Sequence, residues 1–226
     1  YIGDGAFRSC SSLTDIEIPS GVTCIGEDTF NNCGSLTSIK IPDDVTSIGD
    51  RAFSSCSSLT SVKIPDSVTS IGDYTFYRCS SLTSIELPDG LTSIGNYAFS
   101  FCDRLTGIDI PGSVTCISDY AFSYCDGLTT VEIPGSVTYI GDFTFTWCDH
   151  LTSIYFDGDA PVFGDNVFNR VTATAYYPSG NATWTKDVMQ NYGGKITWFA
   201  LEPPHSHEYT AVVTAPTCTE QGYTTY

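Results

Sequence analysis

A repeat of 23 residues is the feature of this sequence that most constrains its fold. Phenylalanine returns at this interval at Phe7, Phe30, Phe53, Phe76, Phe99, Phe122, Phe145 and Phe168. Cysteine keeps the same step from Cys10 to Cys148, and proline keeps it from Pro19 to Pro134. One unit is too short to bury its own apolar side chains, whereas stacked units share a continuous core. The sequence therefore predicts a solenoid.

The order of residues inside a unit predicts how each turn is built. The unit reads C-x-x-L-T-x-I-x-I-P-x-x-V-T-x-I-G-D-x-A-F-x-x, and its L-T-x-I-x-I segment alternates as a half-buried strand does. Ile39 and Ile41 then point inward, while Ser38 and Lys40 point outward. Strands of successive units lie about 4.8 Å apart in one parallel sheet. The V-T-x-I-G segment returns on the opposite side, and the following Asp is expected to cap a short helical turn that carries Ala-Phe.

This unit resembles the treponemal-type, or BspA-like, leucine-rich repeat of bacterial surface proteins over roughly residues 1–170. The resemblance implies an α/β-type solenoid that is mostly β, a right-handed superhelix of 23-residue units with a parallel sheet. It also implies attachment to host matrix proteins, host cells or other bacteria. The location it implies is extracellular, on the bacterial cell surface or secreted.

The repeat pattern divides the chain into three parts. Residues 1–170 form the leucine-rich-repeat solenoid, and the pattern fades from about Ala160. Residues 171–202 read as strand, short helix and strand, which suits a C-terminal cap with a polar outer side. Residues 203–226 read as a linker and a partial β module, a small truncated β tail. Because the sequence opens in the middle of a unit, we expect a fragment of a longer exported protein.

Charge and hydrophobicity exclude two classes of partner. The net charge is −17, from 9 Lys and Arg against 26 Asp and Glu. Phosphate backbones require a basic surface, so a nucleic-acid partner is not expected. No run approaches about 18 apolar residues, so membrane insertion is not expected either. The sequence does not specify the oligomeric state.

The cysteines are predicted to be structural. The seven periodic cysteines form a column whose Cβ vectors run parallel, which favours buried thiols over disulfides. A linear column cannot converge on zinc. Cys24 and Cys116 fall outside the column and are expected to be exposed free thiols. Cys218, His205 and His207 would make half a metal site, but incidental histidines on a truncated hairpin are the preferred interpretation. No metal or cofactor is predicted.

Catalytic residues are not recognisable. His150 lies in a turn without a nucleophile motif, and no G-x-S-x-G, Walker or H-E-x-x-H pattern occurs. An acidic column contains Asp4, Glu27, Asp50, Asp73, Asp119, Asp142 and Asp165. Carboxylates in a row suggest calcium, but caps of successive turns explain the column more simply. We predict that the chain is not an enzyme.

Two outward surfaces are candidate binding sites. The aromatic patch comprises Phe101, Tyr124, Trp147, Tyr120, Phe143 and Tyr139. The sheet face presents Lys40, Lys63, Glu86, Asp109, Glu132 and Tyr155. Aromatic residues are favoured at contact surfaces, yet stacked aromatics also stabilise neighbouring units. The sheet face suits binding in solenoids, yet solvation and the β-propensity of Thr explain it as well.

The function predicted from these observations is a non-catalytic cell-surface binding or adhesion module for an extracellular protein or glycan ligand. A curved repeat surface offers area rather than reactive groups. One alternative is a carbohydrate-binding accessory segment, for which Phe101, Tyr124 and Trp147 would supply rings to stack on sugars. The other alternative is a purely structural spacer, which would bind nothing.

Overall fold

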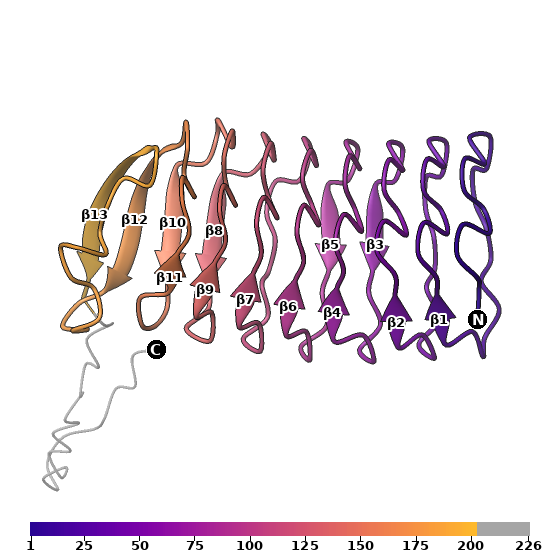
Figure 1. Cartoon of the computed structure of the whole chain (residues 1–226), viewed down its shortest axis with the longest axis horizontal. Coiled ribbons are helices and arrows are strands. Elements are labelled where there is room, and N and C mark those ends of the chain that lie inside the picture. Colours follow the sequence, from indigo (N-terminus) through magenta and orange to yellow (C-terminus); the bar gives the residue numbers. More distant parts are fainter. Residues whose placement is uncertain (203–226) are drawn as a thin grey trace, which may run out of the picture.

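The computed structural model describes residues 1–202, and each repeat unit in this range forms one turn of a β-solenoid. The turns lie side by side along the long axis of the molecule (Figure 1). The predicted partial β module at 203–226 lies outside the described residues, as do Cys218, His205 and His207.

Each turn contributes strands to two faces. The long-strand face, built from the L-T-x-I-x-I segments, contains β3 (Ser61–Lys63), β5 (Ser84–Glu86), β8 (Thr130–Ile133), β10 (Ser153–Phe156), β12 (Thr172–Pro178) and β13 (Lys195–Leu201). The short-strand face, built from the V-T-x-I segments, contains β1 (Cys24–Ile25), β2 (Ser47–Ile48), β4 (Ser70–Ile71), β6 (Ser93–Ile94), β7 (Cys116–Ile117), β9 (Tyr139–Ile140) and β11 (Val162–Phe163).

The strands of each face pair in parallel with their neighbours in adjacent turns. The long-strand face has the order β13-β12-β10-β8 with a separate β3-β5 pair, and the short-strand face has β11-β9-β7-β6-β4 with a separate β1-β2 pair. Partners are one repeat apart, as in Ser93 opposite Cys116. The predicted parallel sheet is confirmed, and the returning V-T-x-I segments form a second sheet that the sequence analysis did not assign.

The predicted helical turns are wrong, because residues 1–202 contain no helix. Two residues of each Ala-Phe turn adopt left-handed backbone angles instead, as Tyr97 (φ 55°) and Phe101 (φ 61°) do around Phe99. Left-handed residues interrupt a right-handed helix. The backbone N–H groups of Tyr97 and Phe99 donate to Asp119 and Ala121 in the next turn, at N···O distances of 3.0 and 2.8 Å. The turns are thus hydrogen-bonded between units as well as within them, where the N–H of Ser100 donates to the carbonyl of Tyr97 at 3.2 Å.

The acidic column also differs from the prediction, because its carboxylates do not cap helices. Asp119 Oδ1 accepts the backbone N–H of Asp142 at 2.8 Å, and Asp142 Oδ1 accepts that of Asp165 at 2.7 Å. Asn96 continues this ladder by accepting the N–H of Asp119 at 3.1 Å. A Cβ added at Gly141 would lie 2.4 Å from Asp119 Oδ1, so glycine leaves room for the carboxylate. The column therefore links successive turns.

The core consists of columns of identical side chains. The rings of the column phenylalanines stack nearly parallel, with centroids 5.4 Å apart between Phe99 and Phe122. All column phenylalanines from Phe30 onward are fully buried. Cys102 Sγ donates to the carbonyl of Phe76 at 3.3 Å, and the other column cysteines from Cys33 to Cys148 make the equivalent contact. The predicted ladder of buried, unpaired thiols is confirmed for the six column cysteines from Cys33 to Cys148, and it is wrong for Cys10, which is exposed in the first turn.

Three cysteines of the described range are not buried. Cys10 is exposed, whereas Cys24 and Cys116 are half-buried rather than fully exposed as predicted. The remaining six thiols are buried. Burial raises the pKa of Cys79 and of Cys148 to about 12, because the thiolate would lose its hydration.

We expect alkylation of the native protein to be confined to Cys10, Cys24 and Cys116 in a Cys218→Ser background. The thiolate is the reactive form, and burial suppresses both its formation and its access. Intact-mass analysis after iodoacetamide treatment should show at most three adducts in buffer and nine in denaturant. Peptide mapping that found any of the six buried column cysteines, Cys33 to Cys148, modified in the native protein would contradict the buried ladder.

The C-terminal turns retain the winding but pack a different core. Between β12 and β13 the chain forms turns instead of the predicted short helix. Trp184 is 6% exposed, and its indole Nε1 donates to the carbonyl of Gly158 at 3.0 Å. Its ring packs against Phe156 and Trp198, with centroids 4.8 and 5.5 Å away. Large aromatic rings thus fill the interior next to the last column phenylalanine, Phe168.

Candidate binding surfaces

The aromatic patch is resolved into two stacked ladders. Phe101, Tyr124 and Trp147 stack with centroids 4.3 and 5.5 Å apart. The second ladder contains Tyr74, Tyr97, Tyr120 and Phe143, with centroids 4.7, 4.6 and 4.9 Å apart. Five of the six predicted patch residues therefore lie in ladders.

Tyr139 does not join these ladders. It lies in β9 on the short-strand face, where it pairs with Cys116 of β7 and Val162 of β11. Within residues 1–202 its ring makes no stacked or edge contact with another aromatic ring. Its side chain is partly desolvated and near Asp119 and Asp142, which raises the pKa of its hydroxyl.

Arginines close both ends of the first ladder. The guanidinium of Arg170 lies 3.9 Å from the centroid of Trp147, and that of Arg78 lies 5.4 Å from the centroid of Phe101. Cations are attracted to aromatic faces at these distances. Neither arginine was predicted as a site residue, although each occupies the column of Phe101 and Trp147 one unit beyond its end. The ring faces of this ladder are consequently occupied by neighbours, and the rings present mainly their edges.

The ladder residues also carry a conformational cost. Phe101, Tyr124 and Trp147 have φ of 61°, 57° and 59°. A left-handed conformation costs roughly 1–2 kcal/mol for a residue with a Cβ. One aromatic pair contributes about 0.5–1.5 kcal/mol beyond its buried area. The stacking energy is therefore similar in size to the backbone strain and offsets it. This structural role explains much of why aromatic residues occupy the ladder, without any ligand.

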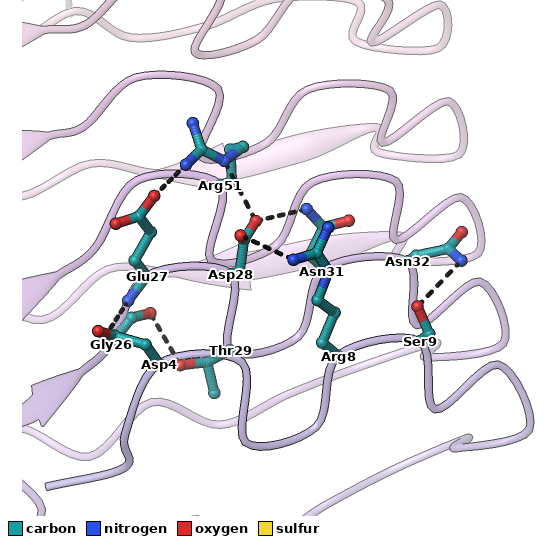
Figure 2. Close-up of polar contacts among 10 residues, drawn as sticks. All are labelled: Asp4, Arg8, Ser9, Gly26, Glu27, Asp28, Thr29, Asn31, Asn32 and Arg51. Atoms are coloured by element: carbon teal, nitrogen blue, oxygen red, sulfur yellow. Dashed lines mark hydrogen bonds and ion pairs between the residues drawn. The ribbon is translucent and has the colours of Figure 1, made fainter.

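A polar cluster replaces the aromatic contacts in the N-terminal turns (Figure 2). The guanidinium Nε of Arg51 lies 3.2 Å from Asp28 Oδ1, and Arg8 approaches the other oxygen at 3.4 Å. Arg51 also contacts the carboxylate of Glu27. Asp28 and Arg51 occupy the same column as Tyr74, so charges link these turns where rings link later ones. Partly exposed pairs of this kind contribute little each.

The predicted sheet-face residues form one row on the long-strand face. Lys63 pairs with Glu86, and Glu132 pairs with Tyr155, across adjacent strands. Lys63 Nζ lies 3.7 Å from Glu86 Oε2. Lys40, Asp109 and the three other charged members are exposed, whereas Tyr155 is half-buried. We name this set the sheet-face row.

Tyr176 and Phe199 extend this row, and neither residue was predicted from the sequence. Tyr176 lies opposite Tyr155, and Phe199 lies opposite Tyr176. The rings of Tyr155 and Tyr176 stack 4.6 Å apart, and Phe199 meets Tyr176 edge-on at 6.0 Å. Tyr176 follows Tyr155 by 21 residues, which is two residues less than the repeat. The regular 23-residue interval from Tyr155 leads to Pro178 and therefore does not reveal Tyr176. Phe199 is 56% exposed.

An acidic cleft lies beside the aromatic end of the row. Its volume is about 410 Å³, and it is lined by Gly107, Ile108, Asp109, Ile110, Thr130, Glu132, Pro134 and Asp157. Gly107 adds no side chain to the lining, and a Cβ there would meet nothing within 4 Å. In residues 1–202, the carboxylates of Asp109, Glu132 and Asp157 have no ion-pair partner.

Other reactive groups are few in the described range. His150 Nδ1 lies 3.0 Å from Asp126 Oδ1, and this contact raises the pKa of the imidazole. His150 is exposed and lies in a turn. No group of three or more His, Cys, Asp or Glu residues between positions 1 and 202 is arranged to hold a metal ion. The same range contains no helix long and apolar enough to cross a membrane.

Comparison with known proteins identifies relatives of this arrangement. Residues 1–80 and 69–186 match the BspA type leucine rich repeat region, in six copies. A leucine-rich repeat protein from Bacteroides ovatus is 29% identical with a TM-score of 0.68, over 89% of this chain and 60% of that chain. The T. pallidum leucine rich repeat protein is 31% identical with a TM-score of 0.65, over 72% of this chain and 78% of that chain.

A leucine rich cell surface protein from Faecalibacterium prausnitzii is 29% identical with a TM-score of 0.48, over 76% of this chain and 63% of that chain. The chain spans less than two thirds of the lengths of the Bacteroides and Faecalibacterium proteins. Comparison with curated proteins gives no match.

Proposed function

This chain belongs to the BspA-type leucine-rich-repeat family, and from that membership we propose that it is a non-catalytic binding module. The module is displayed outside a bacterial cell and holds a protein ligand on its long-strand face. The observation that carries the proposal is the sheet-face row, in which parallel pairing sets Lys63 opposite Glu86 and places Tyr155 between Glu132 and Tyr176. Preorganised side chains lose little conformational entropy on binding.

The composition of the row supports a protein ligand. It passes from Lys40 and Lys63, through the Lys63–Glu86 pair, to Asp109 and Glu132, and it ends in aromatic rings. Mixed charges give a surface specificity for complementary partners. Aromatic residues are enriched where protein contacts contribute most to affinity.

The carbohydrate alternative receives less support. Sugars stack on free ring faces, whereas the faces of Phe101, Tyr124 and Trp147 are covered by one another and by Arg78 and Arg170. Their edges remain available for other contacts.

The net charge supports the extracellular location that we propose. An acidic chain with a net charge of −17 suits an exposed extracellular segment that stays soluble through charge repulsion.

We expect the full chain to capture a protein from an array of host matrix proteins and glycans at physiological salt. A double variant, Lys63→Glu with Glu132→Lys, reverses the charge order of the row and leaves the net charge unchanged. Because misplaced like charges are costly at an interface, its affinity should fall about tenfold or more. The matched variant, Tyr124→Ala with Trp147→Ala, should keep the protein hit.

Three outcomes would contradict parts of this proposal. A protein hit lost only in the Tyr124 and Trp147 variant would move the site to the ladders. Glycan hits without protein hits would favour the carbohydrate alternative. A folded chain that captured nothing would favour the structural spacer. Circular dichroism of each variant would separate loss of binding from loss of folding.

A further inference from the structure

We infer that the C-terminal end of the sheet-face row docks an extended basic peptide segment of a partner protein, in which Arg or Lys alternates with apolar residues. The site comprises the aromatic row Tyr155, Tyr176 and Phe199 together with the acidic cleft beside it. This inference deepens the proposed function and rests on it.

The aromatic row supplies an apolar surface that the described chain does not cover. Phe199 is 56% exposed, and Leu201 on the same outward side of β13 is 39% exposed. Alternate residues of β13 point inward, where Trp198 joins the core cluster. The strand thus separates a half-buried tryptophan, which packs against the core, from exposed apolar side chains. Such a patch on an outer face marks a contact surface.

The charges beside this row select a cationic occupant. Glu132 is the direct cross-strand neighbour of Tyr155, and Asp109 and Asp157 complete the cleft. Lys63, the nearest lysine of the sheet-face row, is already paired with Glu86. A guanidinium or ammonium placed here would meet carboxylates on one side and aromatic rings on the other, and both interactions favour cations.

The dimensions suit an extended segment. From Asp109 to Phe199 the row crosses four strand spacings, or about 19 Å. About six residues of extended peptide span that distance. A second copy of this chain is a poorer occupant, because its own face would bring further carboxylates toward Asp109 and Glu132.

The test uses the full chain and a fluorescent, amidated peptide in which three arginines alternate with three leucines. Citrulline replaces arginine in a neutral control peptide, and glutamate replaces it in an acidic one. We expect fluorescence anisotropy to show binding of the arginine peptide alone, weakened by added salt. Exposed ion pairs are screened by salt, so the slope reports the cationic contribution.

Two variants locate the site. Asp109→Asn with Glu132→Gln should weaken binding about three- to tenfold, as expected for two exposed charge contacts. Tyr176→Ala with Phe199→Ala should weaken it about tenfold through loss of the aromatic contact. The matched control, Asp66→Asn with Asp89→Asn, removes the same two charges elsewhere on the surface. It should leave the affinity within about twofold, the variation usual for surface charges away from a site.

Each other result would overturn the inference. Equal weakening by the Asp66 and Asp89 control would mean attraction by bulk negative charge. Binding of the citrulline peptide at equal strength would remove the role of the cation, and no peptide binding would remove the site. A chain that captured a protein from the array yet ignored the arginine peptide would retain the proposed function and refute this docking site.

Discussion

Replacing Phe99 by alanine is expected to lower the free energy of unfolding by about 3–5 kcal/mol. Phe99 is fully buried, and its ring stacks on Phe76 and Phe122 with centroids 5.5 and 5.4 Å away. Both neighbours are held by further rings of the same column, so they cannot move to fill the cavity. Because each turn contacts only adjacent turns, the substitution weakens two interfaces in the middle of the stack.

Urea denaturation followed by circular dichroism would measure this loss. The matched control is Phe101→Ala, which makes the same side-chain change two residues later at a half-buried position. The decrease in unfolding free energy should be clearly smaller for this variant, because the half-buried ring of Phe101 removes less apolar surface from water than the ring of Phe99 does. Equal losses of unfolding free energy in the two variants would contradict the assignment of the Phe99 column as the principal core. The outer ladder would then contribute as much to stability as the Phe99 column does.

The sequence determined most of the solenoid because its columns are regular. Alternation in L-T-x-I-x-I fixes which side chains are buried, and a one-residue slip would turn them all outward. The strands therefore form in register, with Ser61 opposite Ser84. The buried thiol ladder followed from the same regularity, since a single column of Cys cannot turn its side chains toward one another.

The turns could not be predicted because alternate backbone N–H groups in them donate to the next unit. Asp followed by Ala-Phe resembles a helix N-terminus, yet the N–H of Tyr97 donates to the next unit. Gly5, Asp28 and Asn166 in the same column tolerate positive φ, and this was the available signal. Arg51, three tyrosines and Phe143 at the other positions of the column obscured it.

Site prediction failed where the repeat changes its step. Tyr176 and Phe199 belong beside Tyr155, but the spacing shortens to 21 residues before β12 and moves them out of the sequence column. Tyr139 was grouped with aromatics that lie one segment later in each turn. Arg78 and Arg170 do lie at the regular 23-residue interval from Phe101 and Trp147. They were not predicted as members of the ladder because they are not aromatic.

Replacing Trp184 by alanine is expected to cost about 3–5 kcal/mol and to act mainly on the C-terminal turns. We propose that residues 171–202 cap the solenoid, and Trp184 is the buried side chain at the centre of that segment's aromatic cluster. Its loss removes contacts with Phe156 and Trp198 and leaves the carbonyl of Gly158 without the indole donor. The side-chain amide of Asn181 still donates to that carbonyl at 3.3 Å, so lost packing accounts for most of the expected cost.

Hydrogen exchange would distinguish this effect from that of Phe99→Ala. Amides of β12 and β13 should exchange faster in the Trp184 variant while those of β4 and β6 remain protected, because a terminal defect frays one end of a one-dimensional stack. Phe199→Ala, on the outer side of β13, is the matched control and should leave exchange nearly unchanged. If Trp184→Ala instead loosened every turn equally, the solenoid would unfold as one cooperative unit and residues 171–202 would be an integral part of it rather than a separable cap.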